Sequence, residues 1–158
     1  MGETANDPYL AHRELHTSFH EILNRLLTDF YESSSGGFGN ASDKFAEFKA
    51  CLYLHIRWEE ETLFPMPEIN IKDDTVTSWF RSQHLQIKEL VNLIEKDLKD
   101  GGARTADDFD YEKELVDLLA THGKMEEELL YPLIDKHVGK DELNRALVEL
   151  NGIRNAFV

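Results

Sequence analysis

An eleven-residue segment that occurs twice constrains the fold of this chain more than any other feature of its sequence. The segment 55–65 reads HIRWEEETLFP and the segment 122–132 reads HGKMEEELLYP, so six of the eleven positions are identical. A weaker pair precedes them. The segments that begin at His16 and His84 both carry apolar residues three, six and seven positions after the histidine, and an asparagine eight positions after it. In each pair the second copy follows the first by 67 or 68 residues, so the repeat predicts two helical hairpins of the same design.

Apolar residues recur at intervals of three and four along the chain, which predicts amphipathic helices and no strands. We expect helices from about residue 8 to 32, from about 42 to the prolines at 65 and 67, from about 75 to the glycines at 101 and 102, from about 107 to 139, and from about 141 to 157. The prolines should end the second helix, because proline lacks the N–H group that continues the hydrogen-bond ladder.

The expected fold is therefore all-α. It is an antiparallel up-down four-helix bundle of two pseudo-symmetric hairpins, followed by a short C-terminal fifth helix. We expect residues 1–158 to form a single domain, with the bundle at about 8–138 and the terminal helix at about 141–157.

The repeated segments place ionisable side chains on the predicted apolar faces. Residues four apart share one side of a helix, so His55 lies with Glu59 and His122 lies with Glu126. Both pairs fall on the seams that we expect to be buried, at positions 45, 48, 52, 55, 59 and 63 and at 115, 118, 122, 126, 129 and 133. Glutamate is rarely buried unless it is paired or binds a metal. The pattern therefore predicts a cation site inside the bundle.

The ligand types narrow the choice of cation. Neutral imidazoles and carboxylates without sulfur suit iron, manganese or zinc, and six ligands are too many for one four-coordinate zinc. Two ions bridged by Glu59 and Glu126 would share the negative charge. We favour two iron ions, although composition excludes neither manganese nor zinc.

This pattern of a histidine followed by His-x-x-x-Glu, twice in succession, resembles the hemerythrin-like (HHE cation-binding) family over about residues 10–137. The resemblance implies a diiron centre with bridging glutamates and an oxo or hydroxo bridge. It also implies a role in binding dioxygen, in responding to oxygen, peroxide or nitric oxide, or in holding iron. By position, the implied ligands are His16, His55, Glu59, His84, His122 and Glu126.

The sequence departs from the oxygen-carrying members of that family at one ligand. Those proteins have a fifth histidine one turn before the ligand of the third helix, where this chain has Phe80. The equivalent place on the first helix is His12, which could supply a fifth imidazole to the other ion. We expect His20 not to be a ligand.

Other glutamates and two tyrosines near the expected ligands have less specific predicted roles. The glutamates that follow each ligand glutamate are expected to be solvated; they are Glu60, Glu61, Glu127 and Glu128. Tyr53 and Tyr131 are weaker candidates for a phenol that reaches the site.

Composition limits the possible partners and location. The formal net charge of -14 argues against binding to nucleic acid or to an anionic membrane surface. Cys51 is the only cysteine, and residues 1–8 are polar with no apolar run, so we expect a cytoplasmic protein. No protein partner can be named.

Three functional classes follow from the predicted centre. The leading one is a diiron protein that binds dioxygen or another small diatomic or peroxide ligand, as a carrier or a sensor. The alternatives are an enzyme that consumes peroxide or nitric oxide, and an iron store or donor for the repair of iron centres.

Overall fold

Long helices dominate the computed structural model, which describes residues 7–36, 41–100 and 110–158. The long elements are α1 (Pro8–Gly36), α2 (Ala41–Trp58), α4 (Thr75–Lys99), α5 (Tyr111–Met125) and α7 (Lys140–Asn155). Across these ranges there is no β-strand. The predicted all-α bundle is confirmed.

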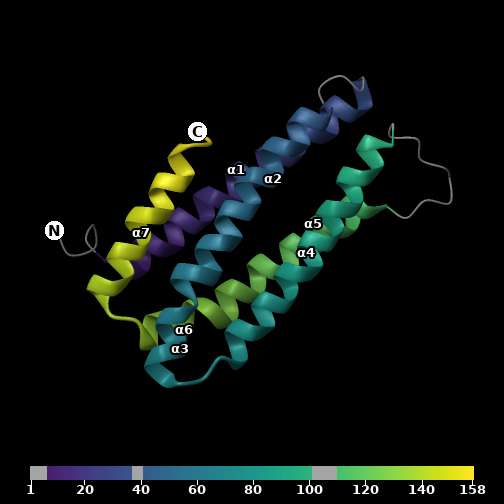
Figure 1. Cartoon of the computed structure of the whole chain (residues 1–158). Coiled ribbons are helices and arrows are strands. Elements are labelled where there is room, and N and C mark those ends of the chain that lie inside the picture. The colour runs from purple at the N-terminus through teal and green to yellow at the C-terminus, as the bar shows by residue number, and fades with distance from the viewer. Residues whose placement is uncertain (1–6, 37–40, 101–109) are drawn as a thin grey trace.

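The helices pack as two hairpins, as Figure 1 shows. Helix α1 lies against α2, and α4 lies against α5, while α2 also contacts α4 and joins the two hairpins. Helix α7 packs against α1 and α2, so it covers the first hairpin. The Trp58 indole fixes this contact by donating a buried 2.9 Å hydrogen bond to the Ala146 carbonyl. The C-terminal helix is thus an integral part of the packing.

Aspartate carboxylates accept from backbone N–H groups at the start of three of the helices. The carboxylates of Asp7 and Asp73 accept from the Tyr9 and Thr75 backbone N–H groups at 3.0 and 2.9 Å. Asp110 caps α5 by accepting from the Lys113 N–H at 3.0 Å. The start expected near residue 107 and the stop expected at residues 101 and 102 lie outside the described residues.

Helix α1 continues to Gly36, a few residues beyond the end expected near residue 32. The Ser33 hydroxyl donates to the Asp29 carbonyl one turn earlier at 2.8 Å, so the serine is accommodated within the helix and does not end it.

The second predicted helix does not end at its prolines, so that expectation was wrong. After α2 the chain makes a π-helical turn, η1 (Glu59–Leu63), and continues as α3 (Pro65–Ile71). Within the turn the Phe64 N–H donates to the Glu59 carbonyl at 2.8 Å, a step of five residues. With the same step of five residues, the Glu60 carbonyl would accept from the N–H group of residue 65. Pro65 has no N–H group. This carbonyl accepts from the Arg81 guanidinium at 3.0 Å instead.

The second hairpin contains the same π-helical turn followed by a short helix. Helix α5 is followed by the π turn η2 (Glu126–Leu130) and by α6 (Tyr131–His137), which packs against α3. After Glu126 the fully buried side chains of this hairpin are spaced by four residues, as they are between Glu59 and Leu63 in the first hairpin. Leu129, which was expected to be buried, is 42% exposed, whereas Leu130 and Ile134 are fully buried. The expected seam positions at Leu129 and Leu133 were therefore wrong, since Leu133 is also only partly buried.

Candidate metal centre

The six side chains expected to be ligands meet in the interior of the bundle. Each of the four long bundle helices contributes a histidine, and each π turn begins at a glutamate of this set. All six are at most 5% exposed, namely His16, His55, Glu59, His84, His122 and Glu126. The centre therefore lies where both hairpins face each other.

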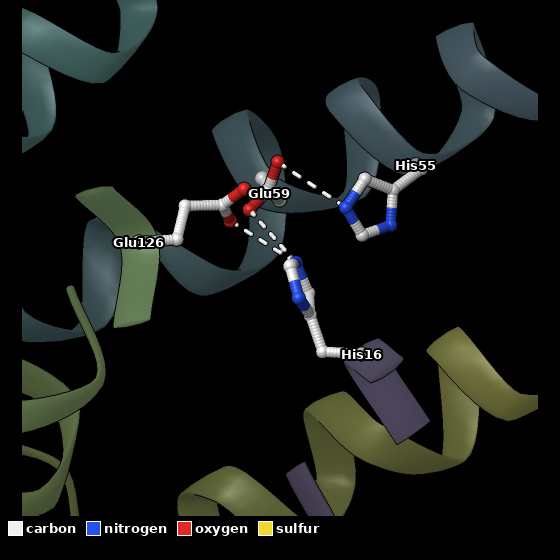
Figure 2. Close-up of side chains that lie close together, drawn as sticks. All are labelled: His16, His55, Glu59 and Glu126. Atoms are coloured by element: carbon white, nitrogen blue, oxygen red, sulfur yellow. Dashed lines mark ion pairs between the residues drawn. The ribbon is translucent and has the colours of Figure 1, made fainter. Parts of the chain in front are cut away.

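Figure 2 shows the first group of ligand atoms. The Nε2 atom of His16 lies 3.0 Å from Glu126 Oε2 and 3.9 Å from Glu59 Oε2. The Nε2 atom of His55 lies 3.4 Å from Glu59 Oε1. One ligand atom from each of these four residues falls within 4.8 Å of the others, which is close enough to surround one ion.

The second group shares Glu59 with the first and adds His84 and His122. The Nε2 atoms of His84 and His122 lie 3.2 Å apart. They lie 3.3 Å from Glu59 Oε1 and 3.1 Å from Glu126 Oε1, respectively. Each carboxylate thus lies between the histidines of the first hairpin and those of the second. This is the arrangement that two bridged cations require.

The polar atoms at the centre lack ordinary partners. Apart from the histidine contacts given above, none of the four carboxylate oxygens of Glu59 and Glu126 has a hydrogen-bond partner among the described residues, and neither does His16 Nε2. Both glutamates are 0% exposed. Burying a carboxylate without compensation costs several kcal/mol, so groups of this kind are paired or coordinate metals. The donor set fits a pair of cations.

The electrostatics of the centre favour positive charge. Burial alone would raise the pKa of Glu126, but the imidazoles of His16 and His122 hold it well below its usual range. Burial disfavours the charged form of His16, yet Glu126 and Glu59 outweigh this effect and raise its pKa to about 10. The carboxylates therefore stay ionised in the interior and are available to a cation.

The outer nitrogen of three of the four histidines meets a partner. The Nδ1 atom of His84 lies 2.9 Å from Glu60 Oε2, and that of His122 lies 2.7 Å from Gln83 Oε1. The Nδ1 atom of His16 is hydrogen-bonded to the Tyr131 hydroxyl. The expectation that Glu60 is solvated was wrong, since its side chain is only 27% exposed and contacts a ligand histidine.

His12 lies beside the centre and not within either ligand group. It is 1% exposed, with its ring centroid 6.0 Å from that of His16 and 5.0 Å from that of Tyr131. Burial and the nearby His16 lower its pKa to about 3, so its imidazole is neutral.

His20 fills the space next to the first ligand group. Its ring centroid lies 4.5 Å from that of His16, and burial lowers its pKa to about 4. A Cβ atom at Gly123 would lie 3.0 Å from His20 Cε1, so a side chain there would require the His20 ring to shift by a few tenths of an ångström.

Aromatic rings form part of the wall around the ligands. Phe80, at the place where oxygen carriers have a fifth histidine, is 0% exposed and packs edge-on against the His122 ring. Phe64 stacks on His84 with an angle of 10° between the ring planes. Tyr53 is instead covered by the ammonium groups of Lys49 and Lys88.

The fold and the buried cluster define a helical bundle built to hold cations. A family model for the hemerythrin HHE cation binding domain matches residues 75–156, which include His84, His122 and Glu126. The match covers more than half of the chain, so this chain belongs to the hemerythrin HHE cation-binding family and is a metal-binding domain.

Two further comparisons found no relatives: no curated protein and no solved structure matches the chain. Within the described residues, no helix has the length and apolar character needed to cross a membrane.

Proposed function

We propose that this chain holds a non-haem diiron centre that binds dioxygen or a related small diatomic or peroxide ligand. One observation carries the proposal. Glu59 and Glu126 each contact imidazole Nε2 atoms of both hairpins, and apart from these contacts none of their oxygens has a hydrogen-bond partner within the described residues. A single ion cannot use both sets of histidines, whereas two ions can share both carboxylates.

The donor set favours iron. Each ion would take two neutral imidazoles and one oxygen from each carboxylate, with no thiolate near them. Such a set leaves iron with open positions for an external ligand, and it agrees with the diiron centre that the family resemblance implies. Manganese and zinc can use the same donors, so the metal has to be measured.

The protein itself would bind, orient and shield the metal pair. The π turns present both glutamates from rigid helices. The rings of Phe19, Phe64 and Phe80 lie against ligand histidines with centroids 4.7, 5.8 and 5.5 Å away. These apolar walls exclude water from the ligand atoms. When bound, a pair of ferrous ions supplies reversible electron transfer to a small ligand at an open position.

His12 is the proposed fifth imidazole. Its Nε2 atom is buried and, among the described residues, has no hydrogen-bond partner, as expected of a nitrogen free to take a ligand role. A His12→Ala protein should lose iron affinity and show a shifted absorption spectrum. Retention of both irons with an unchanged spectrum would remove His12 from the ligand set.

An absorption spectrum recorded before and after air is admitted to the ferrous protein tests the proposed function. We expect near-ultraviolet bands of a bridged ferric pair, and their partial reversal when the gas is removed would support carriage or sensing. A zinc-loaded protein without any chromophore would contradict the proposal. Stopped-flow mixing with peroxide or nitric oxide separates the enzymatic alternative, because an enzyme would sustain turnover.

A further inference from the structure

The two halves of the centre repeat their ligands but not the groups behind them. All four histidines direct Nε2 toward the glutamates, so each Nδ1 atom faces outward. A neutral imidazole that binds a metal through Nε2 keeps its proton on Nδ1 and needs an acceptor there. The quality of that acceptor differs between the hairpins.

The first difference concerns His122 and its counterpart His55. Gln83, which directly precedes His84, places its amide oxygen 2.7 Å from His122 Nδ1. The residue that precedes His16 is Leu15, which offers no acceptor. Accordingly, His55 Nδ1 is buried and has no partner among the described residues. The outer nitrogen of His122 therefore has a hydrogen-bond acceptor, whereas the outer nitrogen of His55 has none among the described residues.

The second difference concerns His84 and its counterpart His16. The Glu60 carboxylate lies 2.9 Å from His84 Nδ1. Glu127, in the equivalent position of the second hairpin, is exposed, and the neutral hydroxyl of Tyr131 meets His16 Nδ1 instead. A carboxylate is a stronger acceptor than a phenol and adds negative charge, so it makes the attached imidazole a better metal ligand.

The support behind His84 extends further outward. Phe64 stacks on the His84 ring. The Arg81 guanidinium lies over the Phe64 ring, 5.2 Å from its centroid. Arg81 also forms an ion pair with Glu68 and donates to the Glu60 carbonyl. The orientation of His84 is thus fixed by its ring face and by its outer nitrogen.

From this asymmetry we propose that the two metal positions are inequivalent. The position between His84 and His122 fills first and retains its ion. The position between His16 and His55 fills second and exchanges its ion more readily. Glu60 and Gln83 are the positioning residues that make the difference. The inference rests on the proposed two-ion centre and adds to it an order of loading that the outer partners set. A His12 imidazole at the position between His16 and His55 would act against this order, so the order should be sharper in the His12→Ala protein.

Iron loading of the metal-free protein under anaerobic conditions tests the order. Crystals grown with one equivalent of ferrous iron should show anomalous scattering mainly between His84 and His122, and calorimetry should resolve two binding steps. Gln83→Leu should weaken the first step by about 10–100-fold, as loss of such outer partners typically does. Gln83→Glu, which keeps an acceptor oxygen, should restore the order of loading.

The pseudo-symmetry supplies matched controls. Glu127→Gln changes the exposed counterpart of Glu60 and should leave both binding steps unchanged, whereas Glu60→Leu should weaken the first. Leu15→Gln, by giving His55 an acceptor, should tighten the second step. Equal occupancy of both positions at one equivalent, or first loading between His16 and His55, would overturn the inference while leaving the diiron proposal intact. Binding of a single ion at saturation would overturn both.

Discussion

At the scale of single residues, the contact between Gly123 and His20 couples helix α5 to the first ligand group. The ring of His20 occupies the space that a side chain at position 123 would take, and it lies beside His16. Glycine inside a helix is less favourable than alanine by about 0.8–1 kcal/mol. The chain accepts this cost where a side chain would displace the His20 ring.

A double-mutant cycle tests this coupling. Gly123→Ala in a His20→Ala background should raise the free energy of unfolding by about 1 kcal/mol, because only the helix propensity changes. In the wild-type background the gain should be cancelled by displacement of the ring. Urea unfolding of the four metal-free proteins measures both values. An equal gain in both backgrounds would show that the two residues are not coupled.

The clustering of the four histidines and two glutamates was predictable from the sequence because the repeat aligns chemically identical residues. The partners of those side chains were not. Gln83 reaches His122 from another helix, so its role depends on how α4 packs against α5. Glu60 follows a ligand by one position, which places it away from the seam in an α-helix. Glu60 lies in the π turn that begins at Glu59, and its contact with His84 depends on where α4 lies relative to this turn.

At the scale of elements, the π turns and α7 decide how the hairpins hold the centre. The sequence shows prolines after each His-x-x-x-Glu motif, and these indicate a helix end when an α-helical ladder is assumed. In the structure a backbone hydrogen bond that spans five residues lets the helix continue past the proline. The spacing of apolar residues in the sequence does not reveal such a bond. The existence of the long helices was therefore predictable from local pattern, whereas the π turns were not.

Helix α7 should contribute to stability through its buried face. Leu150 is 0% exposed, whereas Val148 on the same helix is 76% exposed. Leu150→Ala should lower the free energy of unfolding by about 2–5 kcal/mol, because it removes buried methyl groups and leaves a cavity. The matched change Val148→Ala should stay within about 0.5 kcal/mol. Similar losses from both substitutions would contradict the packing of α7 against the first hairpin.

At the scale of the whole molecule, the centre joins the two hairpins, since every proposed ion has ligands from both. Metal binding should therefore stabilise the complete bundle. A ligand present at one thousand times its dissociation constant adds about 4 kcal/mol to the free energy of unfolding. Ferrous iron should raise the melting temperature of the metal-free protein, and a chelator should reverse the change.

A variant that carries both Glu59→Gln and Glu126→Gln is the control for this stabilisation. Its melting temperature should not respond to iron, because the shared carboxylates are lost. If the wild-type protein melted at the same temperature with and without iron, binding would not join the hairpins in the way the ligand geometry indicates.

The metal content of the wild-type protein purified without air tests the central claim most directly. Elemental analysis should find two iron ions per chain, and none in the protein with both glutamates replaced by glutamine. One zinc ion per chain, or no metal in protein that folds normally and has been offered iron, would contradict the claim that these buried imidazoles and carboxylates serve a pair of iron ions.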